Sequence, residues 1–582
     1  MELTAGSNSR KRGPQIMKKV QGSPQPLGVT IGTERINFAV SVPGGKSCEL
    51  LLYRTGSTDI EAVYPMQEDS AMGEVRFLAL EGISPQEYEY NYRIDRKVCL
   101  DPYVRRITGH RIFGQTEDLE LHKVRGCFLT EPFDWEEDRR PCIPWHENIA
   151  YSLHVRGFTM HSSSKVRQKG TFMGIVEKLS YLKDLGINQI QCMPVYEFEE
   201  CAGKRSNYWG YGPACYFAPK ASYSASGNAA RELKELVKSC HKAGIELILE
   251  MPFEEGILFQ TALECLRYYM LEYHVDGFVV NPYHVSWDGL LNDPLLKGVK
   301  LLKKEDWFQN VMRRFLKGDE GMIEDVIWAL RHNTKEDGCC NYITAHTGFT
   351  LYDLVSYDEK HNQDNGENNQ DGPVYNYSWN CGAEGPSRKR SVMELRKNQM
   401  RNALFLLMTA QGTPCLLAGD EFENTQKGNN NVYCQDNELS WLNWNKLKNN
   451  DSLFRYVKML IKLRREHPVL HRPDALLGLD QISCGTPDVS YHGENAWQVP
   501  ADVSSRQLGV LYCASGQNDN DCFIAYNMHW VRHSFALPAL AKKKKWYRIA
   551  ETSAGILEKP ELLENQKTMV LKERNIVFLI GK

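Results

Sequence analysis

Polar side chains follow short apolar segments of this chain at the positions where buried strands are expected to end. Residues 278–280 read Phe-Val-Val between Gly277 and Pro282, and Asn281 follows the last of them. A carboxylate at the end of a parallel strand could act as a nucleophile, and the neutral amide of Asn281 is a poor substitute. The alternative is a core strand closed by a turn-forming asparagine before proline.

A group of carboxylates, Glu250, Glu254 and Glu255, lies at the end of the apolar segment 245–253. Hard oxygen ligands of this kind could hold a metal ion, but their spacing is not distinctive. We interpret them as part of an acidic, solvated loop, and we expect no metal and no cofactor.

The elements that would position these residues alternate between strand and helix. Apolar helix faces end at Gly186 and Gly244, and residues 394–410 form a long amphipathic pattern. Repeated strand-helix units imply parallel strands, and this many units indicate a closed α/β barrel. The predicted strands are 151–158, 187–194, 245–253, 275–281, 299–302, 343–346 and 414–418.

Both flanks of this region show the period of two that is typical of half-buried strands. Residues 36–42 and 49–53 are strands of a predicted β-sandwich, and residues 508–512, 522–527 and 575–580 belong to a second β domain. The expected domains are a disordered lead at 1–21, an N-terminal sandwich at 22–135, the barrel at 145–472 and a C-terminal β domain at 473–582.

The turn between the first two of those strands reads Gly44-Gly45-Lys46-Ser47. It resembles the end of a P-loop, but Val40 stands where the first glycine of that motif belongs. We therefore predict an ordinary turn here.

Composition excludes several classes of function. The 582 residues carry a net charge of −3, which gives no argument for a nucleic acid partner. No run of about 18 apolar residues exists, so no membrane span is expected. The 17 cysteines show no CxxC pair and are typical of reduced thiols.

Several motifs, in one order along the chain, resemble the isoamylase branch of the α-amylase superfamily, whose members debranch glycogen and starch. The resemblance implies a (β/α)8 TIM-type barrel flanked by an N-terminal starch-binding-type β-sandwich and a C-terminal β-sandwich. The motifs begin with His154-Val-Arg-Gly-Phe-Thr and Asn207-Tyr-Trp-Gly-Tyr, and continue with Ala345-His346-Thr347-Gly-Phe-Thr-Leu, Asn365-Gly-Glu-Asn-Asn and Gly419-Asp-Glu.

The same resemblance implies that the catalytic acids have been replaced. Retaining hydrolysis requires a carboxylate nucleophile and a carboxylic acid about 5–5.5 Å apart. The nucleophile position is Asn281, its orienting arginine is Val279 and the third acid is Thr347. The acid/base position falls on Lys304 without a gap, or on Glu305 with one inserted residue, and both remain open.

An isoamylase-like barrel without these acids is similar to the plant non-catalytic isoamylase 2 type. The resemblance implies a regulatory subunit that binds branched α-glucan and joins a catalytic isoamylase in a hetero-oligomer, trimming α-1,6 branches of pre-amylopectin in plastids. Trp209, Tyr211 and His346 are the candidate substrate-binding residues, since aromatic faces suit sugar rings. Loop packing is the competing interpretation for the two aromatics, and a structural role for the histidine.

Two other functions stay open. One is an active glycoside hydrolase with a rebuilt site that pairs Glu305 with Glu254 or Glu255, which would have to meet about 5–10 Å apart. The other is an interaction scaffold that no longer binds glucan.

Overall fold

The computed structural model describes residues 17–67, 72–115, 118–201, 203–481, 483–514, 519–541 and 543–582. The chain divides into two compact units. Unit 1 comprises Met1–Asp134, Tyr196–Cys201 and Gly212–Leu233, and unit 2 comprises Trp135–Val195, Ala202–Tyr211 and Lys234–Lys582. Of the predicted lead, residues 1–16 lie outside the described residues, and Lys18–Val20 already form strand β1.

Unit 1 contains the N-terminal β-sandwich. One sheet has the order β1-β6-β3-β2, and the other has the order β5-β4-β7-β10-β9 with β8 on β7. Inward residues such as Phe38, Leu50 and Tyr90 pack into one buried cluster. The strands are β2 (Gly28–Ile31), β3 (Arg35–Ser41), β4 (Cys48–Arg54), β5 (Ile60–Pro65), β6 (Val75–Glu81), β7 (Tyr88–Ile94), β8 (Lys97–Cys99), β9 (Ile107–Thr108) and β10 (Arg125–Cys127), followed by the pair β13 (Tyr196–Phe198) and β14 (Ala214–Pro219).

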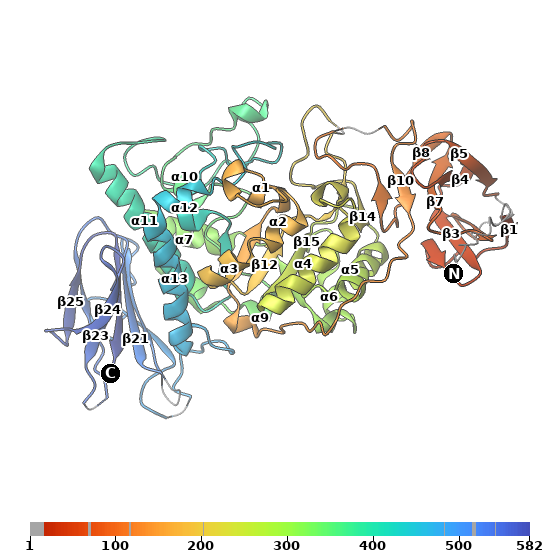
Figure 1. Ribbon diagram of the computed structural model, residues 1–582. Coiled ribbons are helices and arrows are strands. Elements are labelled where there is room, and N and C mark those ends of the chain that lie inside the picture. Colours follow the sequence, from red (N-terminus) through yellow and green to blue (C-terminus); the bar gives the residue numbers. More distant parts are fainter. Residues whose placement is uncertain are drawn as a thin grey trace, which may run out of the picture. The chain divides into compact units, whose positions relative to one another are not determined.

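Unit 2 is built around a parallel sheet with the order β17-β16-β15-β12-β11-β18. Helix α3 (Leu179–Leu185) lies beside β12 in Figure 1. Gly277 opens β16 because a Cβ there would lie 2.2 Å from the carbonyl oxygen of Lys300 on β17. The strands are β11 (Ala150–Leu153), β12 (Gln189–Cys192), β15 (Glu246–Met251), β16 (Gly277–Val280), β17 (Lys300–Lys303) and β18 (Cys415–Leu417).

The sheet closes through a segment that makes only single bridges. Lys303 pairs with Cys339, and Asn341 pairs with Pro414, both in parallel. The curled sheet therefore meets itself, as in an α-amylase-type barrel. The predicted strand at 343–346 is wrong, because the bridging positions lie at 339 and 341 and residues 343–346 form no ladder.

The first barrel strand also ends earlier than predicted. The strand expected at 151–158 stops at Leu153, and helix α1 (Val155–Thr159) follows. His154 ends the strand because its side chain accepts a hydrogen bond from the backbone amide of Gly157 and so caps the helix. A local capping hydrogen bond therefore outweighs the apolar run here.

The helices of unit 2 supply the outer layer of the barrel. Gly186 ends α3 with φ at 103°, as its position after the apolar face predicts. The pattern at 394–410 forms α11. The remaining bounds are α2 (Phe172–Val176), α3 (Leu179–Leu185), α4 (Ala229–Ala243, which begins in unit 1), α5 (Phe259–Tyr273), α6 (Trp287–Leu291), α7 (Trp307–Lys317), α8 (Ile323–Arg331), α9 (Thr334–Asp337), α10 (Leu351–Leu354), α11 (Arg390–Thr409), α12 (Asn445–Asn449) and α13 (Asp451–Glu466).

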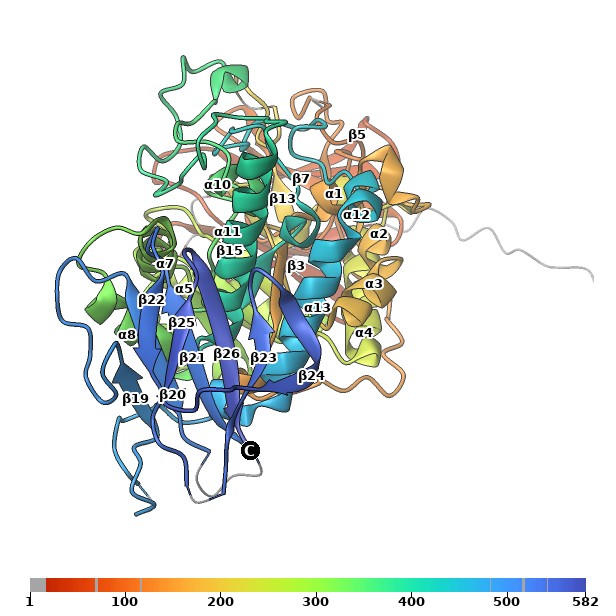
Figure 2. The same cartoon turned by 90° about the vertical axis from the view of Figure 1, so that its left-hand side faces the viewer.

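The C-terminal β domain packs against α11 and α13 (Figure 2). Its main sheet has the order β19-β20-β21-β26-β23-β24, with β22 and β25 forming a second pair. None of the described helices combines the length and apolarity that a bilayer crossing requires. The strands are β19 (Val489–His492), β20 (Gln507–Tyr512), β21 (Asp521–Asn527), β22 (His533–Ala536), β23 (Trp546–Glu551), β24 (Gly555–Leu562), β25 (Thr568–Leu571) and β26 (Asn575–Gly581).

Candidate functional site

Three neighbouring barrel strands carry the polar residues at the mouth of the barrel. Ile248, Val279 and Leu302, from β15, β16 and β17, belong to one buried cluster and therefore share the inner face of the sheet. Side chains alternate along a strand, so the residues two positions further on continue that inner face. These residues are Glu250, Asn281 and Lys304.

Lys304, Glu250, Tyr211 and His346 form a closed network, which we call the mouth network. The ammonium of Lys304 donates to Glu250 Oε1 at 2.9 Å and Oε2 at 3.0 Å, and it lies 3.1 Å from His346 Nδ1. The hydroxyl of Tyr211 donates to Glu250 Oε1 at 2.6 Å and lies 2.5 Å from His346 Nε2. One arrangement satisfies every group: neutral His346 accepts at Nδ1 and donates from Nε2.

The charge states follow from burial and from Lys304. Burial lowers the pKa of His346 to about 3, with the Lys304 ammonium acting in the same direction, so the ring is neutral. Burial opposes ionisation of Glu250, but the Lys304 charge, the His346 ring and the hydrogen bonds from Tyr211 and Lys304 together outweigh it, so the pKa of that carboxyl lies below its usual value. The network therefore holds one ammonium against one carboxylate.

A second ion pair joins the same two strands at the opposite end of the barrel core. Lys300 Nζ lies 2.6 Å from Glu246 Oε2, and both residues stand four positions before Lys304 and Glu250. A spacing of four keeps a side chain on the same face of a strand. Lysine-glutamate pairs thus close the apolar core between β15 and β17 at both ends.

The other two positions where carboxylates were expected hold neutral groups. The side-chain oxygen of Asn281 accepts from the backbone amide of Tyr283 at 3.0 Å, so this residue closes the turn after β16. Thr347 is half-buried and follows His346 directly. Neither side chain has an ionisable group that could attack a substrate or donate a proton.

Lys304 and Glu305 occupy different environments. Lys304 enters the mouth network, whereas Glu305 pairs with Lys303 at 2.7 Å and its side chain is 34% exposed. Lys303 and Glu305 are two residues apart and lie on the opposite face from Lys304. Glu254 and Glu255 are exposed.

The two candidate aromatics lie beside the mouth network in different ways. Trp209 is only 5% exposed and packs edge-on against His346, with ring centroids 4.9 Å apart. Tyr211 is half-buried and uses its hydroxyl for Glu250 and His346. Trp209 therefore forms a wall of the site, and Tyr211 links that wall to the mouth network.

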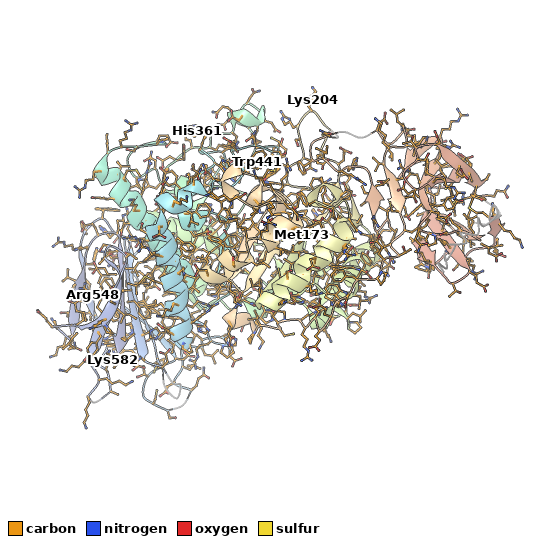
Figure 3. The ribbon with its side chains drawn as sticks, in the orientation of Figure 1. Met173, Lys204, His361, Trp441, Arg548 and Lys582 are labelled. Carbon is orange, nitrogen blue, oxygen red and sulfur yellow. The ribbon has the colours of Figure 1, made fainter. Side chains whose placement is uncertain are left out.

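A pocket of about 450 Å³ opens beside the mouth network. The loop that contributes Trp209 and Tyr211 also carries Lys204, which projects outward in Figure 3. Sequence reasoning missed most of the lining, because its residues come from loops far apart in the chain. The lining consists of Arg205, Ser206, Asn207, Trp209, Tyr211, Glu367, Asp371, Asn431 and Tyr433.

Side-chain amides hold the loops of this pocket together. Asn362 Nδ2 donates to Asn430 Oδ1 at 2.8 Å, and Asn429 Nδ2 donates to Asn365 Oδ1 at 3.0 Å. Asn431 Nδ2 donates to Asp371 at 2.9 Å. The asparagine-rich segment 362–371 thus acts as structural support for the pocket wall, since its amides are used within the fold.

One group in the part of the chain that the structure describes has ligand atoms of the kind that bind metals. Atoms of His467, Asp519 and Cys522 lie within 4.8 Å of one another. His467 Nδ1 already bonds Asp519 at 2.8 Å, and the Cys522 thiol contacts the Asn520 carbonyl at 3.3 Å. The first contact joins the residue after α13 to the C-terminal domain, and the second lies within that domain, so hydrogen bonding accounts for the group.

Comparison with known proteins places this geometry in a family. Residues 156–254 match the family model described as alpha amylase, catalytic domain. Isoamylase 1, chloroplastic, of Arabidopsis thaliana is 32% identical over 588 residues, covering 76% of this chain and 75% of that protein. The Glycogen operon protein GlgX homolog of Mycobacterium tuberculosis is 30% identical, covering 81% and 82%.

Solved structures agree in fold. The apo pullulanase of Paenibacillus barengoltzii superposes with a TM-score of 0.73 at 19% identity, covering 96% of this chain and 94% of that one. The same enzyme in complex with maltohexaose and α-cyclodextrin gives 0.70 at 19% identity, covering 96% of both chains. At 30% or more identity over most of their length, the relatives decide the assignment: the chain belongs to the isoamylase-type debranching enzymes of the α-amylase superfamily.

Proposed function

We propose that this protein is a non-catalytic, glucan-binding regulatory subunit of an isoamylase-type debranching complex that acts on α-1,6 branches of pre-amylopectin in starch synthesis. The observation that carries the proposal is the pairing of Lys304 with Glu250 at 2.9 Å beside the neutral Asn281. An ammonium stands where an acid would be needed, and an amide where a nucleophile would be needed.

Chemistry at this mouth lacks both partners of retaining hydrolysis. That reaction needs one carboxylate to attack the sugar and one carboxylic acid to protonate the leaving oxygen. Glu250 is held ionised by Lys304, so it is a poor proton donor. Lys304 bonded to a carboxylate is a weak acid and no nucleophile.

Glucan binding is supported by the pocket beside the mouth network. Trp209, Tyr211 and Tyr433 supply aromatic surface, and Asn207 and Asn431 supply amides, in a volume of about 450 Å³. This combination of ring faces and hydrogen-bonding groups suits a sugar chain. A pullulanase of the same fold binds maltohexaose and α-cyclodextrin.

A barrel without the required acids can change branch cleavage only through a second, catalytic chain, and we therefore propose a catalytic isoamylase as the partner. A plastid location is proposed because relatives include chloroplastic isoamylases of Arabidopsis thaliana, rice and maize. Bacterial GlgX homologs are also similar, so this part of the proposal depends on the source of the chain.

The decisive experiment measures reducing ends released from amylopectin by the purified chain, alone and after addition of a catalytic isoamylase from the same source. We expect no release by the chain alone and an altered rate or product profile in the mixture. Release by the chain alone that Glu305→Gln abolishes would overturn the proposal and support a rebuilt hydrolase. Failure to co-sediment with amylopectin would instead support a scaffold without glucan binding.

A further inference from the structure

The N-terminal β-sandwich contains a pocket of about 530 Å³ that the proposed function does not use. It lies at one end of the sandwich, where the loop from β3 to β4 meets the turn from β7 to β8. Its lining includes Lys46, Arg76, Arg93 and Arg96, together with Ser47 and Glu49.

The four basic side chains come from four different segments and from both sheets. Arg76 lies on β6 opposite Val40 of β3, and Arg93 lies on β7 opposite Glu49 of β4. Lys46 comes from the β3–β4 loop. The two strands fix the positions of Arg76 and Arg93, whereas Lys46 and Arg96 are exposed side chains at the rim of the pocket.

The turn that carries Arg96 is held against the loop that carries Lys46. The backbone amide of Asp95 donates to the carbonyl of Ser47 at 3.0 Å. Asp95 and Arg96 have φ of 47° and 67°, the left-handed conformation of a tight hairpin turn. This turn fixes the backbone position of Arg96 at the rim of the pocket.

Positive charge is in excess among the lining residues that the structure describes. Four basic side chains face one carboxylate, Glu49, which Arg93 Nε already binds at 2.6 Å. Arg76 is only 3% exposed, and a charge close to a low-dielectric interior exerts a stronger field than one in water. Converging cations repel one another, so an anion in the pocket would relieve that repulsion.

We propose that this pocket binds a phosphate monoester. Guanidinium groups match the oxygens of a phosphate in paired hydrogen bonds, and Lys46 adds a point charge at the rim. The volume exceeds the needs of phosphate alone and leaves room for an attached sugar. No P-loop is involved, since the Gly44–Ser47 turn leads into strand β4 and not into a helix.

Two sources could present this chemistry: a free sugar phosphate, or a phosphate ester carried on a glucan chain. The binding site is independent of the mouth network, so the proposal stands apart from the proposed function. The experiment titrates the full chain by calorimetry with inorganic phosphate, glucose 6-phosphate, glucose, and a maltooligosaccharide that carries one 6-phosphate.

Saturable binding of phosphate and of glucose 6-phosphate, with none of glucose, is expected. Arg96→Gln and Lys46→Gln should each raise the Kd about fivefold to tenfold, since each removes one charge-assisted contact. Lys97→Gln is the matched control, because Lys97 is exposed and adjacent to Arg96 but does not line the pocket, and it should leave the Kd unchanged.

The set of titrated ligands also distinguishes a free sugar phosphate from a phosphate ester on a glucan chain. Because the chain has a proposed glucan pocket elsewhere, the same oligosaccharide without phosphate is titrated in parallel. Tighter binding of the phosphorylated oligosaccharide than of both this control and glucose 6-phosphate, reduced by Arg96→Gln, assigns the pocket to phosphate on a glucan chain. Equal effects of Arg96→Gln on glucose 6-phosphate and on the phosphorylated oligosaccharide, with no such gain in affinity, assign it to free sugar phosphates. The proposal would be overturned if phosphate showed no saturable binding. It would also be overturned if Lys97→Gln raised the Kd as much as Arg96→Gln or Lys46→Gln does.

Discussion

The ammonium of Lys304 contacts both carboxylate oxygens of Glu250, at 2.9 and 3.0 Å, across strand β16, which Asn281 follows. The strand register pairs Glu250 with Val279 and Val279 with Leu302, so Lys304 lies two residues beyond the level of Glu250. At the level of Glu250, Val279 of β16 lies between β15 and β17. The Lys304 ammonium therefore reaches Glu250 from the next inward-facing position of β17, beyond Leu302.

Removal of Lys304 should destabilise the barrel. Lys304→Met leaves the Glu250 carboxylate, which is 6% exposed, without its cation, and we expect a loss of about 3 kcal/mol in the free energy of unfolding. Urea denaturation of the full chain measures it. Glu305→Gln is the control and should stay within about 0.5 kcal/mol, because its pair with Lys303 is partly exposed. The double variant with Glu250→Gln should cost less than the sum of the single changes, and simple additivity would contradict the pairing.

Restoring one acid should not restore hydrolysis. Asn281→Asp puts a carboxylate at the position that the proposed function assigns to the lost nucleophile, but Lys304 still occupies the position assigned to the proton donor. Because such residues act as a unit, we expect no reducing ends above the background of the unchanged chain on amylopectin. A clear rate in this single variant would show that another group donates the proton.

Tyr433 should contribute to glucan binding through its ring. Tyr433→Ala removes aromatic surface from the pocket, and we expect the affinity for amylopectin to fall about tenfold in a co-sedimentation titration. Tyr433→Phe keeps the ring and should retain most of the affinity. Trp328→Ala is the matched control, since Trp328 is 67% exposed on α8 and does not line the pocket. If Trp328→Ala lowered the affinity for amylopectin as much as Tyr433→Ala does, glucan binding could not be assigned to this pocket.

Lys220 is the cation on which a buried cluster of unit 1 depends. Its ammonium is fully buried and lies 2.7 Å from Glu197 and 2.6 Å from Glu200. Lys220→Met leaves two buried carboxylates without this partner, so we expect a loss of about 3–5 kcal/mol in the unfolding of unit 1. Calorimetry of the full chain measures this loss of unfolding free energy. Lys97→Met, a substitution of an exposed lysine, is the control. A loss below about 1 kcal/mol would mean that His110 compensates, since it lies 3.2 Å from Glu197.

Acidification should destabilise the fold through His154. Burial lowers the pKa of this ring to about 4, and Nδ1 accepts the Gly157 amide while Nε2 bonds the Tyr208 carbonyl. A lowered folded pKa means that the unfolded chain binds the proton more tightly, so stability falls as pH drops from about 6.5 towards 4. This group alone should cost about 2 kcal/mol between pH 7 and pH 5.

His154→Asn isolates that contribution. Asparagine keeps a helix-capping oxygen and does not titrate. Urea denaturation at pH 7 and pH 5 should show a smaller pH dependence in the variant than in the unchanged chain. Identical pH dependence in both chains would mean that the other buried histidines, such as His471 and His492, carry the effect.

The sequence by itself determined the class of fold and the residue types at the barrel mouth. Strand and helix periods predicted the barrel and the flanking β domains, and the motifs around Asn281 and Thr347 put an amide and a hydroxyl where the family resemblance implies acids. The fold class follows from local patterns, because the period of apolar residues reports which face of an element is buried.

Only the tertiary structure decided which residue enters the barrel mouth. Side chains alternate along β17, so a register shift of one residue would put Glu305 on the inner face in place of Lys304. The motif in the sequence fits either residue, depending on whether one inserted residue is allowed. The strand register puts Leu302 in the core and therefore Lys304 in the mouth. Its pairing with Glu250, 54 residues away, depends on two strands that the chain brings together only when the barrel forms.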